Sequence, residues 1–158
     1  RWRSIIDRDI EVEAVNRVRA VREAVGPDVE ILVEAHRRLP PVNAIRVARE
    51  MEPYRPYWYE ESVSSRDPNS LAEAKHNINL PVITGEKLYT KAEFRDIFEK
   101  RAADIINPDV CNCGGILELK EIAAMTEVST LPCHTIFTTA QPSASQRPFT
   151  PQSRCQTS

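Results

Sequence analysis

An acidic side chain recurs at a nearly constant interval along this chain of 158 residues, each time at the end of a short apolar segment. Glu34, Glu60, Glu86 and Asp109 are separated by 26, 26 and 23 residues, and His134 follows 25 residues later. Such an interval is the length of one strand plus one helix, the repeating unit of a parallel α/β sheet. The spacing therefore predicts a chemically active side chain at the exit of each successive strand.

The hydrophobic pattern between these residues indicates the same α/β class, because it switches repeatedly between a period of 3.6 and a period of 2. Strands are expected at residues 28–36, 57–61, 80–86 and 103–109, and the apolar stretch 130–134 follows them. Helices are expected at residues 12–25, 43–52, 67–77, 91–101 and 116–127. Regular alternation of this kind favours right-handed βαβ units and a parallel sheet.

Local signals place the helix boundaries. The first helix is expected to bury one stripe of valines: Val12, Val15, Val18, Val21 and Val25. It should end at Gly26, a typical residue after a helix C-terminus. Asp67 followed by Pro68 is typical of a helix start. Thr90 and Glu93 have the spacing of a capping box, which predicts another helix start there.

The recurring acids indicate a metal site. In a parallel barrel the carboxyl ends of the strands share one rim, and active sites lie on that rim. Carboxylates brought together there repel one another unless a cation lies among them, and hard oxygen ligands suit Mg²⁺. For any single acid the alternative is a solvated loop residue. Four acids in register followed by a histidine are much harder to attribute to chance.

Composition limits the class of protein. With 41% hydrophobic and 28% charged residues, the chain has the makeup of a globular domain. A formal net charge of −2 gives no reason to expect a nucleic acid or a membrane as partner. Four unevenly spaced cysteines do not suggest a secreted disulfide framework, so a cytoplasmic location is expected. A zinc site at Cys111, Cys113, Cys133 and His134 is disfavoured, because a CxC pair without a matched second pair is a weak signal.

Four segments carry a resemblance to a known family: ILVEAH at 31–36, YWYEES at 57–62, VITGEKLYT at 82–90 and DIINPDVCNCGGI at 104–116. They resemble the enolase superfamily, in its mandelate racemase and muconate lactonizing branch, and within it the galactonate dehydratase-like acid-sugar dehydratases. The resemblance covers residues 10–128. It implies a fold of class α/β that is a partial (β/α) barrel, about five βα units of a modified TIM barrel.

The resemblance also implies a set of site residues. Mg²⁺ would be held by Glu34, Glu60 and Glu86. His134, oriented by Asp109, would be the base that removes the proton next to the substrate carboxylate, and Mg²⁺ would stabilise the resulting enediolate. His36 would be the general acid that assists loss of the β-hydroxyl, because strand alternation places it on the same face as Glu34.

The implied activity is that of a carbon–oxygen lyase (hydro-lyase) acting on a small-molecule sugar acid. Its product would be a 2-keto-3-deoxy sugar acid, and the complete enzyme is expected to be a homo-oligomer. One alternative is a racemase or epimerase of the same superfamily, which needs opposing bases on both faces of the substrate. Another is a catalytically dead fragment or binding scaffold.

The chain departs from the family pattern in several places. Glu34 stands where the family usually has aspartate, and Ser62 replaces the proline that usually follows the paired glutamates. The lysine base of an earlier strand would lie upstream of Arg1. Asp109 and His134 stand about two residues closer than in the family, which makes His134 the least secure of the implied residues.

Residues 129–158 are a different kind of sequence from the barrel segment 1–128. After Glu127 there is no acidic residue in 31 positions, and the stretch is rich in Ser, Thr, Gln and Pro. An irregular tail is expected, either a disordered extension or the product of a reading frame shifted near residues 129–135. A barrel lacking strands on both sides is expected to expose strand edges and to show little or no activity.

Overall fold

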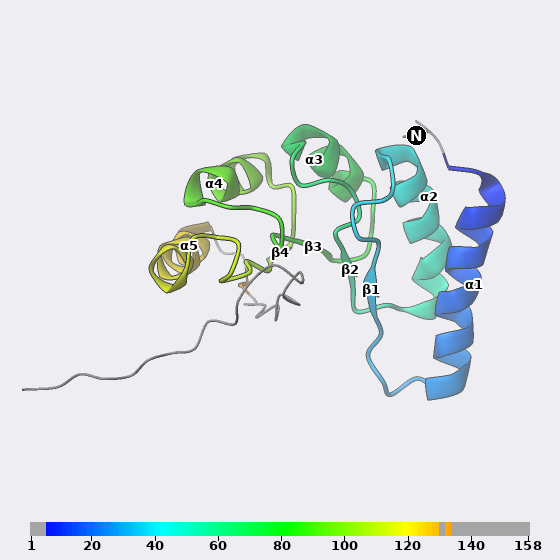
Figure 1. Cartoon of the computed structure of the whole chain (residues 1–158). Coiled ribbons are helices and arrows are strands. Elements are labelled where there is room, and N and C mark those ends of the chain that lie inside the picture. Colours follow the sequence, from blue (N-terminus) through cyan, green and yellow to red (C-terminus); the bar gives the residue numbers. More distant parts are fainter. Residues whose placement is uncertain (1–5, 130–131, 134–158) are drawn as a thin grey trace, which may run out of the picture.

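The sheet is parallel and follows the chain order. A computed structural model describes residues 6–129 and 132–133 (Figure 1). Its four strands are β1 (Leu32–Glu34), β2 (Trp58–Glu60), β3 (Val82–Thr84) and β4 (Ile105–Ile106). They pair as β1-β2-β3-β4, all parallel. Cys133 adds a parallel bridge to Ile106, so the chain returns to the sheet beyond β4. The predicted α/β class and partial (β/α) barrel are confirmed.

The helices form one layer on one side of the strands. They are α1 (Arg8–Val25), α2 (Pro41–Met51), α3 (Pro68–His76), α4 (Lys91–Lys100) and α5 (Ile116–Ser129), with a 3₁₀ turn η1 (Glu52–Tyr54) after α2. Figure 1 shows them following one another in an arc around the row of strands, and each packs against the next. Among the helices in the described part of the chain, none is long and apolar enough to cross a membrane.

The two faces of the sheet carry different side chains. Tyr59 and Val82 are register partners, and both belong to the hydrophobic core that the helices share. In the other direction Tyr59 pairs with Val33 of β1, and the next residue of each strand, Glu60 and Glu34, are register partners as well. Since successive side chains of a strand point to opposite faces, these two glutamates face away from the helices. The inner face also carries apolar Ile83 and Ile105, the neighbours of Glu60 in the register, so its acids are confined to the ends of β1 and β2.

The predicted valine stripe of α1 is wrong in part. Val15 and Val18 are 8% exposed, whereas Val12 and Val21 are 40% and 46% exposed. A helix turns about 100° per residue, so Val12 and Val21, nine residues apart, lie on opposite sides. The buried face instead begins with Glu11, four residues before Val15.

Glu11 can occupy this buried face because its carboxylate is paired. It accepts hydrogen bonds from Arg8 Nη1 at 2.8 Å and from Asn43 Nδ2 at 2.5 Å. Asn43 also bonds both backbone groups of Ile6, each at 3.2 Å. A buried acid is tolerated when its hydrogen-bonding capacity is met in this way. The cluster ties the start of α1 to α2.

The two predicted helix starts differ in how closely they follow expectation. Asp67 caps α3 as predicted, accepting hydrogen bonds from the Ser70 N–H at 3.1 Å and the Ser70 hydroxyl at 2.6 Å. At α4 the Thr90 side chain makes no capping bond, and Glu93 instead accepts from the Tyr89 N–H at 2.6 Å. The helix still begins at Lys91, but neither bond of the predicted capping box forms, because Glu93 bonds the residue before the N-cap.

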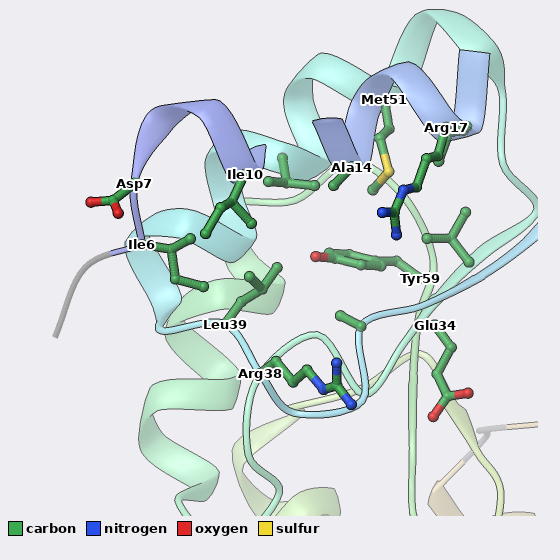
Figure 2. A pocket seen from close by; sticks show the side chains of 14 residues that line it. Ile6, Asp7, Ile10, Ala14, Arg17, Glu34, Arg38, Leu39, Met51 and Tyr59 are labelled. Atoms are coloured by element: carbon green, nitrogen blue, oxygen red, sulfur yellow. The ribbon is translucent and has the colours of Figure 1, made fainter. Parts of the chain in front are cut away.

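The edge of the sheet at β1 is open in the described part of the chain. Leu32 is 53% exposed there. Beside β1 lies a largely apolar cavity of about 550 Å³ between α1, α2 and the strand (Figure 2). Figure 2 shows the Tyr59 ring inside this cavity and the Glu34 carboxylate pointing away from the ring. The exposed edge matches the expectation for a barrel that lacks a neighbouring strand here.

Gly85, directly after β3, lies against the backbone of Asn107, directly after β4. Its φ is +142°, and a Cβ atom there would lie 3.0 Å from the backbone N and C of Asn107. We therefore predict that Gly85→Ala lowers the free energy of unfolding by about 3 kcal/mol, since backbone strain adds to a clash with rigid backbone. Urea denaturation followed by circular dichroism measures this.

Gly26→Ala is the matched control. Gly26 also has a positive φ, +77°, but a Cβ atom at this position would have no other atom within 4 Å. Strain alone then predicts a loss of about 1–2 kcal/mol. Equal losses at the two glycines would contradict the close approach of Gly85 to Asn107.

Candidate metal centre at the strand exits

Glu34 and Glu60 lie side by side at the ends of β1 and β2. They are direct partners in the parallel register, and neighbouring strands are about 4.8 Å apart. Glu34 is exposed and Glu60 is half-buried. The parallel pairing alone therefore brings two of the three predicted ligands together on the inner face.

Glu86 reaches the same place from the turn after β3. One ligand atom each from Glu34, His36 and Glu86 lie within 4.8 Å of one another, close enough to share a metal ion. The Glu86 side chain is largely shielded, at 15% exposed. This group contains His36 and not Glu60, which lies beside Glu34 through the strand register. The ligand set Glu34, Glu60 and Glu86 therefore stays a prediction.

Glu60 is electrostatically the most strained of the three acids. Burial raises its pKa above the ordinary value, and the negative charges of Glu34, Glu61 and Glu86 raise it further. The one opposing contact is a hydrogen bond from Asn107 Nδ2 to Glu60 Oε1 at 2.6 Å. A carboxylate in these surroundings is stabilised by a bound cation, which removes the repulsion.

Arg37, in the turn after β1, supplies positive charge to this group of acids. Its Nη1 donates to Glu86 Oε2 at 3.1 Å and to Glu61 Oε2 at 3.2 Å. Burial alone would raise the pKa of Glu86, but Arg37 and then Lys87 lower it below the ordinary value. Lys87 Nζ lies 3.4 Å from Glu86 Oε1. The surroundings therefore favour the ionised form of Glu86 and disfavour that of Glu60.

Glu61 lies beneath this cluster and is fully buried. Its Oε1 accepts from the Thr84 hydroxyl at 2.8 Å and the Gly85 N–H at 3.0 Å, and its Oε2 faces Arg37. Because both oxygens are directed into the protein, Glu61 is a support of the site and not a ligand.

His36 lies beside the candidate ligands with its ring tautomer constrained. Arg37 Nη2 is 3.3 Å from His36 Nε2, and a guanidinium can only donate. Nε2 must then accept, which leaves Nδ1–H to donate to Glu34 Oε1 at 2.6 Å. The φ values of His36 and Arg37 are +52° and +60°, an uncommon backbone for such residues. The turn after β1 is thus shaped to bring both side chains to the rim.

Asp109 lies at the exit of β4 and is 2% exposed. Its carboxylate accepts from the Cys111 N–H at 2.8 Å and from Asn112 Nδ2 at 3.1 Å, and Asn112 Nδ2 also bonds the Glu86 carbonyl at 2.9 Å. Asp109 therefore organises the turn after β4 and links it to the Glu86 turn. Its predicted partner His134 lies outside the described residues, so the Asp109–His134 pair stays a prediction.

The residues present fit a hard divalent cation. Glu34 and Glu86, with neighbouring Glu60 and with solvent on the exposed Glu34 side, would supply the oxygen ligands that Mg²⁺ prefers. Arg37, Glu61 and Asn107 were missed in the sequence. The signal was there for two of them: Glu61 doubles the Glu60 position, and Asn107 lies on the same turn as Asp109.

Comparison with known proteins identifies the family. Residues 6–148 match the family model described as enolase C-terminal domain-like. A D-gluconate dehydratase of Thermoproteus tenax is 36% identical over 114 residues, which is 72% of this chain and 23% of that protein. A D-galactonate dehydratase of Cronobacter sakazakii is 35% identical over 124 residues, or 78% of this chain and 32% of that protein. The chain spans about a quarter to a third of the length of these relatives.

Solved structures show the same fold. A member of the enolase superfamily from Salmonella Typhimurium superposes with a TM-score of 0.80 at 32% identity, covering 84% of this chain and 34% of that one. A racemase from Streptomyces coelicolor with bound magnesium gives a TM-score of 0.79 at 27% identity, covering 83% and 37%. The chain belongs to the enolase C-terminal domain-like family.

Proposed function

We propose that this chain is the central barrel segment of a Mg²⁺-dependent acid-sugar dehydratase. The observation that carries the proposal is the convergence of Glu34, His36 and Glu86 within 4.8 Å, beside Glu60. Relatives named D-gluconate and D-galactonate dehydratase support the substrate class. We expect the substrate to be a small-molecule sugar acid and the complete enzyme to be a homo-oligomer.

Glu34, Glu60 and Glu86 would hold the cation. A bound Mg²⁺ would supply positive charge to a substrate carboxylate and so make the neighbouring C–H more acidic. Asn107 keeps Glu60 oriented through its 2.6 Å hydrogen bond. Arg37 and Lys87 keep Glu86 ionised, as its lowered pKa indicates.

His36 and the Asp109–His134 pair would move the protons. His134, held by Asp109, would take the α-proton of the substrate. His36 would then protonate the leaving β-hydroxyl, so that water departs and a 2-keto-3-deoxy acid forms. Since Nδ1–H donates to Glu34 and Nε2 accepts from Arg37, His36 must first take up a proton from solvent on Nε2 before it can act as the acid. This step breaks only the contact from Arg37 Nη2, while Arg37 Nη1 keeps its contacts with Glu61 and Glu86.

A racemase or epimerase is the second candidate. It is favoured by the structural likeness to the Streptomyces coelicolor racemase. His36 distinguishes the two: a dehydratase needs an acid at this position, whereas a racemase needs a second base on the opposite face of the substrate.

We expect residues 1–158 alone to show little or no activity, since catalysis requires groups held within about 0.5 Å of productive geometry by a closed barrel.

One prediction concerns Glu60→Gln and Mg²⁺. In wild type, Mg²⁺ at about 100 times its Kd should raise the free energy of unfolding by about 2.7 kcal/mol. Glu60→Gln should abolish this gain, because it removes a ligand while retaining the oxygen that accepts from Asn107. Thermal denaturation with and without Mg²⁺ measures it. Glu73→Gln, at an exposed acid of α3, is the control and should respond to Mg²⁺ like wild type.

The same variant has a predicted pH signature without metal. Because the pKa of Glu60 is raised in the folded state, the folded protein binds more protons than the unfolded chain between the ordinary value of 4.5 and the raised value. Stability therefore falls as pH rises through this window. Glu60→Gln should be more stable than wild type at pH 7, and the difference should vanish below about pH 4.5. A variant less stable than wild type at pH 7 would refute the strained-acid account.

A further prediction concerns His36→Asn in a longer chain that completes the barrel. Dehydration should be lost by a factor of about 10²–10⁴, while exchange of the substrate α-proton with solvent continues, because the base is a different residue. Nuclear magnetic resonance in D₂O follows both reactions. Full dehydratase activity in this variant would remove His36 from the mechanism, and loss of exchange as well would favour a role as base.

A further inference from the structure

Arg37 joins a buried acid to a candidate metal ligand. Glu61 is fully buried, and its Oε1 is already engaged by the Thr84 hydroxyl and the Gly85 N–H. The Arg37 guanidinium lies between Glu61 Oε2 and Glu86 Oε2, with Nη1 at 3.2 Å and 3.1 Å from them. One nitrogen thus bridges a fixed carboxylate and a carboxylate that faces the metal centre.

The backbone holds Arg37 in this position. The Arg37 N–H donates to the Glu61 carbonyl at 2.8 Å, so residues 37 and 61 are linked through both main chain and side chain. Both residues have positive φ, +60° and +45°, which non-glycine residues adopt only when their surroundings enforce it. The Arg37 side chain is also only 18% exposed. The guanidinium is therefore anchored at its Glu61 end and is not a freely moving surface charge.

We propose that Arg37, anchored by buried Glu61, is a positioning residue that orients Glu86 for the metal ion. This inference rests on the proposed magnesium centre. It gives Arg37 and Glu61 a supporting role there, although neither would bind the metal itself. Supporting groups that hydrogen-bond to metal-ligating carboxylates commonly change metal affinity by 10–100-fold when they are lost. The orientation of Glu86 would otherwise depend on partly exposed Lys87 and solvent.

The sign of the change in affinity distinguishes positioning from simple charge repulsion. Arg37 is a cation next to a cation site, so removing its charge should by itself tighten Mg²⁺ binding. If Arg37 orients Glu86, removing it should instead weaken binding. The two accounts predict opposite changes in one measured quantity.

The experiment is calorimetric titration of Mg²⁺ into the 158-residue chain and its variants. Arg37→Gln should raise the Kd for Mg²⁺ about 10-fold. Arg38→Gln is the matched control, because Arg38 is the adjacent, exposed arginine, and its Kd should equal that of wild type. The Kd of Arg37→Lys should lie between those of wild type and Arg37→Gln, since an ammonium keeps the charge but lacks the planar fork of a guanidinium.

A double variant separates positioning from folding. Arg37→Gln leaves Glu61 as a buried charge without its cation, which lowers stability. Arg37→Gln combined with Glu61→Gln removes that charge and should recover the urea midpoint. The double variant should nevertheless keep the weak Mg²⁺ affinity, because Glu86 still lacks its support. It also gives a folded protein for titration if the single variant does not fold.

Each outcome decides the question. The proposal is supported if Mg²⁺ binds weakly to the Arg37→Gln single variant and to the double variant with Glu61→Gln, and binds to Arg38→Gln as it does to wild type. Unchanged or tighter binding in Arg37→Gln overturns it, as does recovery of affinity together with stability in the double variant. If wild type itself does not bind Mg²⁺, the proposed metal centre fails, and this inference fails with it.

Discussion

Repulsion among like charges is the constraint on which this structure depends. Parallel pairing places Glu34 beside Glu60, and the turns that follow bring Glu61 and Glu86 to the same rim. Two unit charges 4 Å apart interact by about 4 kcal/mol at an effective dielectric constant of 20. The fold offsets part of this with Arg37, Lys87 and the Asn107 amide. Burial, and then the negative charges of Glu34, Glu61 and Glu86, still raise the pKa of Glu60, and a divalent cation would favour its ionised form.

The turns at the strand exits accept unusual backbone geometry to build this rim. Positive φ angles occur at His36, Arg37, Glu61 and Gly85, all within the turns that follow β1, β2 and β3. Strain of this kind persists where surrounding contacts enforce it and is concentrated at functional sites. Here the contacts are the hydrogen bonds that cross from one turn to the next, such as Arg37 N–H to Glu61 O and Asn107 N–H to Thr84 O. The helices, by contrast, pack conventionally on the other face.

The parts of the fold that could be predicted are those set by local periodicity. Strand and helix order, the Asp67 cap and the rim position of Glu34, Glu60 and Glu86 follow from spacing along the chain. The face of α1 was mispredicted, because valines three residues apart drift around a helix and the buried position 11 is a glutamate paired with Asn43 from α2. Glu61 and Asn107 lie beside predicted site residues, but Arg37 had no such signal. The roles of all three arise from contacts between turns 24 to 49 residues apart, which spacing alone does not show. The role of His134 and the irregular tail predicted for residues 129–158 stay predictions, because His134 and most of that tail lie outside the described residues.

A metal soak tests the central claim most directly. Mn²⁺ can replace Mg²⁺ at oxygen-rich sites and gives an anomalous X-ray signal, so crystals of this chain, or of a longer chain that contains it, would locate the ion. The account predicts one anomalous peak on the inner face of the sheet, within bonding distance of a carboxylate oxygen of each of Glu34, Glu60 and Glu86. A peak bound elsewhere, or no peak among these three carboxylates at saturating Mn²⁺, would contradict it.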